Sequence, residues 1–145
     1  MTSHSVVLAI DPGKDKCGVA WLCVEKFTAA DRVLESVIAR EIVPRGEVVA
    51  RIGEIAARYD NLEIVIGHAT MSRVLREEIE AVVSIEVHVI DETGSTLEAR
   101  PLYWQANPPR GWRKWMPLSS QVPPEPIDDF AAIILAARFM NDDVS

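Results

Sequence analysis

The sequence has few of the features that mark secreted, membrane or disulfide-rich proteins. It contains two cysteines, Cys17 and Cys23, which are too few for a disulfide framework and match no zinc-binding spacing, so we expect reduced thiols. No apolar run approaches the roughly 20 residues that a membrane-spanning helix requires. Residues 1–5 lack the charged and apolar regions of a signal peptide. These absences predict a cytoplasmic protein with no membrane partner.

Basic residues are also scarce, and the net charge is −7. This charge argues against a protein that coats nucleic acid nonspecifically, because such binding depends on neutralising many phosphates. The charge is unevenly spread, however, since the stretch from Ala99 to Pro124 contains four basic residues and no acidic one. That segment is suited to face a polyanion.

The periodicity of the apolar residues predicts a single α/β domain over residues 1–145, a length typical of one domain. The first three expected strands are joined by short polar connections, which favours antiparallel pairing, whereas the alternation of strands and helices after them requires parallel pairing. The prediction is therefore a five-stranded mixed sheet flanked by helices. The expected strands span residues 6–10, 18–24, 34–43, 63–67 and 86–90, and the clearest helices span 48–59, 74–83 and 129–140.

Two further features concern the chain between the last strand and the last helix. Ser95 and Glu98 have the spacing of a capping box, which predicts a helix starting at about Thr96, and Pro101 should kink or shorten it. Residues 105–126 are rich in proline and lack periodicity, which predicts an irregular loop. Loops of this length in compact domains are often functional.

Acidic residues occupy three positions where strands end or a helix begins. Asp11 follows the first strand, Asp91 and Glu92 follow the fifth, and Asp128 and Asp129 open the last helix. Ligands of open parallel sheets collect at the carboxyl ends of the strands, so these acids are candidates for one site. Each also has a structural interpretation, as a turn, a solvated strand end or a helix N-cap respectively.

Clustered carboxylates repel one another unless a cation lies among them, and Mg²⁺ prefers oxygen ligands. Two such ions about 4 Å apart can activate the attacking water and stabilise the leaving oxygen in a phosphoryl displacement. If the acids meet, the pattern therefore indicates nuclease chemistry.

Several segments resemble known nuclease families. Leu8 to Gly13, together with Gly18-Val19-Ala20, resembles the first-strand motif of RuvC-like nucleases. His88 to Arg100 resembles the aspartate-glutamate, serine-threonine and alanine-arginine signature of the YqgF family, the pre-16S ribosomal RNA nucleases, and Ile127 to Leu135 resembles its closing helix.

The resemblance implies an RNase H-like fold with a metal-dependent acidic site. It assigns Asp11, Glu92 and Asp128 as the catalytic, metal-binding set, with Asp91 and Asp129 in reserve, and Mg²⁺ or Mn²⁺ as a two-ion cofactor. The implied activity is phosphodiester hydrolysis in pre-16S rRNA processing, and a Holliday-junction-resolvase-like DNA nuclease is the alternative.

The loop after the fourth expected strand departs from the glycine-leucine-proline of many relatives and reads Gly67 to Ser72. Thr70 or Ser72 either caps the next helix or helps to bind a phosphate at its N-terminus. His68 either meets the scissile phosphate or is a hydrogen-bonded core residue.

The second departure is an enlarged segment in which cationic and indole side chains alternate. Arg110, Arg113 and Lys114 can neutralise phosphates, and Trp112 can stack on unpaired bases of RNA or of branched or single-stranded DNA. The alternatives are that the tryptophans clamp the loop onto the body or form a homodimer interface.

Two other function classes compete with a nuclease. A non-catalytic nucleic-acid-binding protein on the same fold is compatible with the acidic net charge and the altered loop. An actin-like ATPase also begins with an aspartate-glycine loop, but this chain is too short to supply both halves of that fold.

Overall fold

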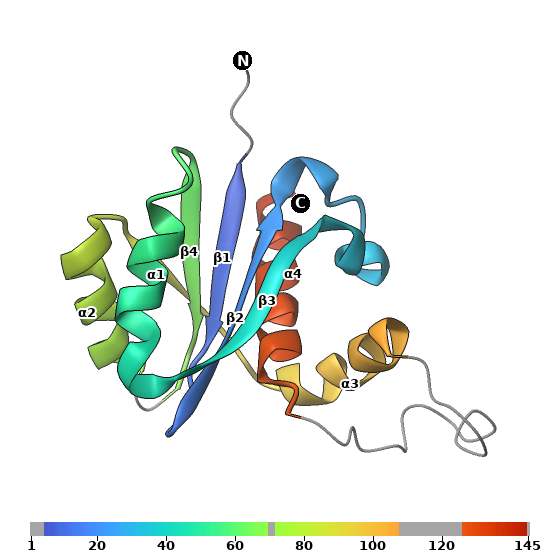
Figure 1. Cartoon of the computed structure of the whole chain (residues 1–145). Helices are drawn as coiled ribbons and strands as arrows, with labels where there is room; N and C mark the ends of the chain where they lie inside the picture. Colours follow the sequence, from blue (N-terminus) through green and yellow to red (C-terminus); the bar gives the residue numbers. More distant parts are fainter. Residues whose placement is uncertain (1–4, 70–71, 108–125, 145) are drawn as a thin grey trace.

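The computed structural model describes residues 5–69, 72–107 and 126–144. Its centre is one five-stranded sheet in the order β3-β2-β1-β4-β5 (Figure 1). β2 pairs antiparallel with β1 and β3, whereas β4 pairs parallel with β1 and β5. The predicted mixed sheet is confirmed. The strands are β1 (Val6–Asp11), β2 (Lys16–Cys23), β3 (Val37–Pro44), β4 (Leu62–Gly67) and β5 (Val87–Ile90).

β1 is the central strand and is buried on both faces, as its uninterrupted apolar sequence indicates. Leu8 and Ile10 belong to the hydrophobic core on one face of the sheet, and Val7 and Ala9 belong to the hydrophobic core on the other face. The position after this buried run, Asp11, therefore lies at the end of the central strand of the sheet.

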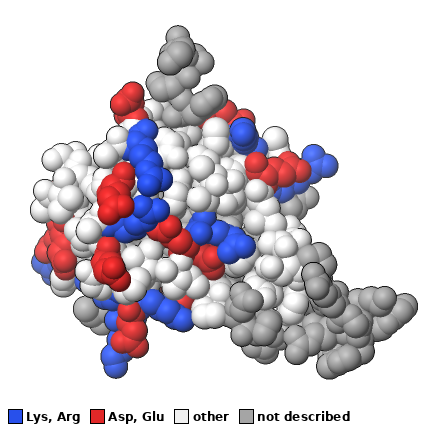
Figure 2. All heavy atoms as spheres, in the orientation of Figure 1, with Lys and Arg blue, Asp and Glu red and all other residues white. Residues whose placement is uncertain are grey.

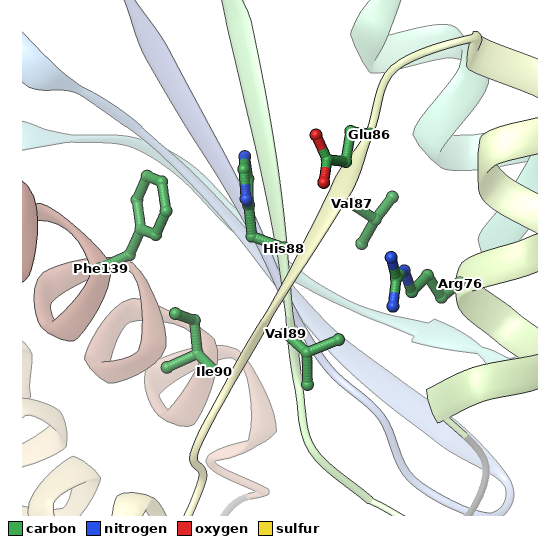
Figure 3. Close-up of a pocket in the computed structure, with 7 residues that line it drawn as sticks. All are labelled: Arg76, Glu86, Val87, His88, Val89, Ile90 and Phe139. Carbon is green, nitrogen blue, oxygen red and sulfur yellow. The ribbon is translucent and has the colours of Figure 1, made fainter.

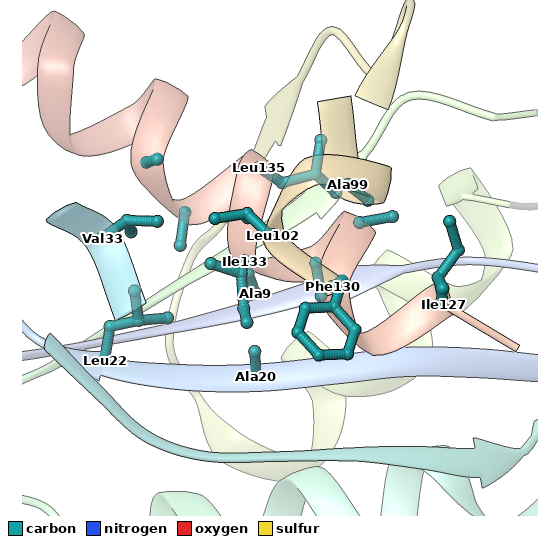
Figure 4. Packing of buried hydrophobic residues seen from close by; sticks show 14 of the residues in the cluster. Ala9, Ala20, Leu22, Val33, Ala99, Leu102, Ile127, Phe130, Ile133 and Leu135 are labelled. Carbon is teal, nitrogen blue, oxygen red and sulfur yellow. The ribbon is translucent and has the colours of Figure 1, made fainter. Parts of the chain in front are cut away.

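Helices cover both faces of the sheet. α1 (Val48–Ala56) and α2 (Ser72–Val83) pack on one face, and α3 (Ser95–Ala106) and α4 (Asp128–Val144) pack on the other (Figure 1). α4 crosses β1 and β2 closely because the facing residues are small or flat (Figure 4). These residues include Ala9, Ala20, Ala132 and Phe130. This close packing fixes the N-terminus of α4 against the sheet.

Some sequence-based boundaries are wrong. The chain from Ala30 to Ser36 forms a 3-10 helix, so β3 begins at Val37 rather than at Leu34. The Oγ of Ser36 donates a hydrogen bond of 2.6 Å to the carbonyl of Val33, which closes that turn. α1 also ends at Ala56, before the predicted Tyr59. Short 3-10 helices over Val24–Lys26 and Arg45–Glu47 complete the connections between the elements.

The predicted capping box is also wrong. The N-cap of α3 is Gly94, with a φ of 76°, and no side chain caps the helix. The carboxylate of Glu98 instead accepts a hydrogen bond from Arg138 on α4. Pro101 does not shorten the helix, which continues to Ala106.

The face shown in Figure 2 carries interspersed acidic and basic side chains rather than a broad patch of one sign. Ion pairs of this kind occur among the described residues, as where Arg51 pairs with both Glu41 and Glu54. The described part of this face therefore offers no extended positive surface. In the described ranges no helix has both the length and the apolar character needed to cross a membrane.

Candidate active site

Asp11 and Glu92 meet at the carboxyl end of the parallel strands. Asp11 ends β1, and Glu92 follows β5, two strands away in the sheet. Neighbouring strands are about 4.8 Å apart, so the connection after β5 must turn back over β4 to bring Glu92 close to Asp11. It does so: the Cβ of Glu92 lies 3.3 Å from the position that a Cβ on Gly67 would occupy, and its carboxyl is close enough to Asp11 to raise the pKa of that group.

Gly67 makes this reach sterically feasible. It ends β4 between the two acids, and a Cβ atom at this position would lie 2.6 Å from Oε2 of Glu92 and 3.1 Å from Cδ1 of Leu135. Atoms that are not bonded do not approach a Cβ this closely, so the side chain of Glu92 occupies the space that a larger residue would fill. The glycine therefore admits the carboxylate to the site.

Asp128 joins from the opposite direction, at the first turn of α4. The cross-strand partner of Asp11 on β2 is Gly18, and the backbone of Asp128 lies directly over it, so close that a Cβ on Gly18 would overlap the Asp128 carbonyl. The charge of Asp128 acts on Asp11, and its Oδ2 lies 3.8 Å from Nζ of Lys16. The helix therefore brings a third acid to the end of β1.

Burial and mutual repulsion disfavour ionisation at this site. The pKa of Asp11 is raised from its ordinary 3.8 to about 7, first by burial, then by the charges of Glu92 and Asp128. Burial also raises the pKa of Glu92, against the lowering effects of the Asp11 hydrogen bond and the nearby His68. At neutral pH, Asp11 and Glu92 can share one proton.

The ligand types at the site suit a hard cation, but the described side chains do not form a complete set of metal ligands. All its donors are carboxylate oxygens, which suit Mg²⁺ or Mn²⁺, and Mg²⁺ commonly uses one or two carboxylates plus water. Within the described ranges, no group of three or more acidic, histidine or cysteine side chains stands ready to hold one ion. The carboxylates of Asp11 and Glu92 are suited to bind one cation together. Asp128 lies close to this pair.

The two reserve acids are engaged elsewhere. The exposed Asp91 accepts hydrogen bonds from the backbone N–H and the hydroxyl of Thr93, at 3.0 and 2.7 Å, and these bonds lower its pKa. Asp129 is buried and accepts a 2.7 Å hydrogen bond from Arg40, whose guanidinium also lies 4.2 Å from the centre of the Phe130 ring. Both therefore have structural roles in this structure.

His68 lies at the rim of the site. A hollow of about 480 Å³ is lined by Asp11, His68 and Glu92, together with Pro12, Asp91, Thr93, Ser95 and Thr96. The side chain of His68 is exposed, and its backbone N–H donates to the carbonyl of Ile90 at 2.8 Å. The interpretation of His68 as a core residue is therefore wrong.

A separate hollow of about 450 Å³ runs along the outer edge of β5 (Figure 3). Arg76 of α2 borders it on one face of the sheet and Phe139 of α4 on the other, with the ring of His88 packed 5.2 Å from that of Phe139. It contains none of the three predicted metal ligands.

Several predicted substrate-binding residues lie outside the described residues. They are Thr70, Arg110, Trp112, Arg113 and Lys114. Ser72 is described, and its hydroxyl donates a 2.7 Å hydrogen bond to the carbonyl of Ala69 at the start of α2.

Sequence reasoning identified the acids but missed the residues that bring them together. Gly18, Gly67, Lys16 and Arg138 were not selected. The available signals were two glycines, since Gly18 belongs to the segment that resembles the RuvC-like first-strand motif and Gly67 ends the fourth strand, but their meaning depends on which elements lie beside them.

Comparison with known proteins supports the fold. No protein-family model and no curated protein matches the sequence. Two solved structures of RuvC from Thermus thermophilus resemble it over nearly the whole length of both chains. The RuvC in complex with a Holliday junction substrate has 16% identity and a TM-score of 0.57 over 98% of this chain and 97% of that one. The other RuvC structure has 14% identity and a TM-score of 0.59 over 96% of each. With the sheet topology, this likeness establishes an RNase H-like fold.

Proposed function

We propose that this chain is a metal-dependent nuclease that hydrolyses phosphodiester bonds, with Asp11, Glu92 and Asp128 as its catalytic set. The observation that carries the proposal is the half-buried Asp11 carboxyl, which lies close to two other acids at the end of the central strand. Among the described residues, no lysine or arginine pairs with Asp11 or Glu92. Buried acids without a positive partner are costly, and a divalent cation would remove that cost.

In this proposal Asp11 and Glu92 bind the ion directly, and Asp128 contributes a ligand or orients a bound water. A bound Mg²⁺ or Mn²⁺ would lower the pKa of the attacking water and stabilise charge on the phosphate. Lys16, beside Asp128, is placed to meet a substrate phosphate. A two-ion site stays a prediction.

The fold and the sequence point to two nucleic acid substrates. One of the similar RuvC structures is a complex with a Holliday junction, which favours branched DNA. The segment from His88 to Arg100 resembles the YqgF signature, which favours pre-16S ribosomal RNA. We place branched DNA first because the RuvC likeness extends along the whole chain.

A cleavage panel tests the proposal. Single-stranded RNA, single-stranded DNA, a four-way DNA junction and a structured RNA precursor are each incubated with Mg²⁺, Mn²⁺ or EDTA. We expect metal-dependent cleavage that Asp11→Asn abolishes, whereas Asp60→Asn, at an exposed position before β4, leaves it intact. Binding without cleavage by the wild-type chain would instead identify a non-catalytic nucleic-acid-binding protein.

The basic segment is proposed to hold the substrate. Replacing Arg113 and Lys114 by Ala should weaken nucleic acid binding and reduce the slope of affinity against salt by about 2, one for each lost phosphate contact. The measurement is a binding titration between about 50 and 200 mM salt. An unaltered slope would assign that segment a structural role.

A further inference from the structure

The connection that carries Glu92 is short and largely exposed. Only residues 91–94 join β5 to α3, and Asp91, Thr93 and Gly94 are all exposed. Gly94 adopts a left-handed conformation, and glycine is the residue that leaves most backbone freedom at such a position. Local hydrogen bonds from Thr93 to the Asp91 side chain and from the N–H of Ser95 to the carbonyl of Glu92 shape this connection, but they do not tie it to the rest of the fold.

Arg138 holds the connection from outside. Its Nη1 donates a 2.7 Å hydrogen bond to the carbonyl of Asp91, and its Nη2 donates a 2.8 Å hydrogen bond to the carbonyl of Thr93. These two carbonyls belong to the residues on either side of Glu92. The guanidinium therefore grips the backbone at both neighbours of the proposed ligand.

Glu98 keeps the guanidinium in place. Its Oε2 accepts a 2.8 Å hydrogen bond from the same Nη2 of Arg138, whose side chain is 25% exposed. A planar guanidinium offers donors in a fixed fork, which a flexible lysine ammonium does not reproduce. The three acceptors together define one orientation of Arg138.

The same helix also carries Asp128. Arg138 follows Asp128 by ten residues on α4, which corresponds to roughly 15 Å along the helix axis. One rigid element thus places one acid of the site directly and fixes the connection that supports another. A shift of α4 would move both acids together.

We propose that Arg138 is a positioning residue that holds Glu92 in the geometry required for divalent-cation binding. This inference rests on the proposed function, since it assigns Glu92 to the metal. Groups that orient metal ligands commonly change metal affinity 10- to 100-fold when they are removed. Loss of the fork should therefore weaken the cation site without touching a ligand.

The test compares the full-length wild-type chain with Arg138→Met, Arg138→Lys and a matched control, Arg58→Met. Arg58 is exposed after α1 and far along the chain from the acids. Mn²⁺ affinity is measured directly from the signal of free Mn²⁺ in electron paramagnetic resonance, with no substrate present. We expect Arg138→Met to weaken Mn²⁺ binding about 10- to 100-fold. Arg138→Lys should have an intermediate effect, and Arg58→Met none.

Amide hydrogen exchange of the metal-free protein supplies an independent readout. Exchange over residues 92–95 should accelerate in Arg138→Met and not in Arg58→Met. Faster exchange with unchanged Mn²⁺ affinity would overturn the proposal, as would wild-type behaviour in both measurements. If Arg138→Met fails to fold, Arg138→Lys decides by the same criteria.

The two proposals fail in different ways. A wild-type chain that binds Mn²⁺ but cleaves no nucleic acid contradicts the proposed nuclease, while the Mn²⁺ affinities still decide the role of Arg138. A wild-type chain that binds no Mn²⁺ overturns both.

Discussion

Replacing Asp11 by Asn should stabilise the metal-free protein at neutral and alkaline pH, although it removes a proposed catalytic group. The pKa of Asp11 is raised from 3.8 to about 7 by burial and by the charges of Glu92 and Asp128. At about 1.4 kcal/mol for each tenfold change in proton affinity, this difference corresponds to at most roughly 4 kcal/mol. Asparagine has nearly the same shape, carries no charge and can donate a hydrogen bond to Glu92.

The sign follows from proton binding. Between about pH 4 and 7 the folded wild-type chain retains the Asp11 proton that the unfolded chain releases. The free energy of unfolding therefore falls as pH rises through this window, and the loss is complete above pH 7. The asparagine variant lacks this loss. Its advantage over the wild type should be absent near pH 4 and reach about 1–4 kcal/mol at pH 8.

The assay is denaturant unfolding in EDTA at several pH values between 4 and 8, with Asp60→Asn as the control for loss of an exposed carboxylate. Added Mn²⁺ should raise the midpoint of the wild type and leave that of Asp11→Asn nearly unchanged, because a ligand stabilises only the state that binds it. An Asp11→Asn variant no more stable than the wild type at pH 8 in EDTA would refute the electrostatic reasoning.

Three further substitutions test how the site is built. Gly67→Ala should displace the Glu92 carboxylate, because the added Cβ would lie 2.6 Å from its Oε2. The rate of cleavage should therefore fall at least tenfold, while the unfolding midpoint changes little. Asp129→Asn should lower the free energy of unfolding by about 1–2 kcal/mol in denaturant titrations, because it removes the charge that the partly exposed guanidinium of Arg40 pairs with. Lys16→Met should change stability by less than about 0.5 kcal/mol, since its ion pair is exposed, and should reduce the salt slope of nucleic acid binding by about 1.

The sheet could be predicted from the sequence because the buried strands consist of apolar residues. The run from Val6 to Ile10 is apolar at every position, and it became the central strand with both faces covered. The parallel arrangement followed from strand and helix alternation. The start of β3 was missed because Leu34 continues the apolar pattern into a 3-10 helix, where its side chain still packs on the core.

The candidate ligands could be predicted in part, because acids that follow strands are visible in the chain itself. Which of these acids face the site and which form structural ion pairs could not be predicted, since it depends on partners far away in the sequence. The sequence makes Asp129 a reserve candidate for the metal, whereas in the structure its carboxylate accepts a hydrogen bond from Arg40, which is 89 residues distant. Glu98 matched a local capping rule, but a charged donor from α4 offers a stronger hydrogen bond than a backbone N–H does.

The geometry of the site depends as much on missing side chains as on the carboxylates. Gly18 lets the first turn of α4 rest on β2, and Gly67 lets Glu92 cross β4. The carboxylate at position 92 and the absence of a side chain at Gly67 beneath it are therefore both needed to form the site. It follows that the site can be lost through either glycine while every acid is retained.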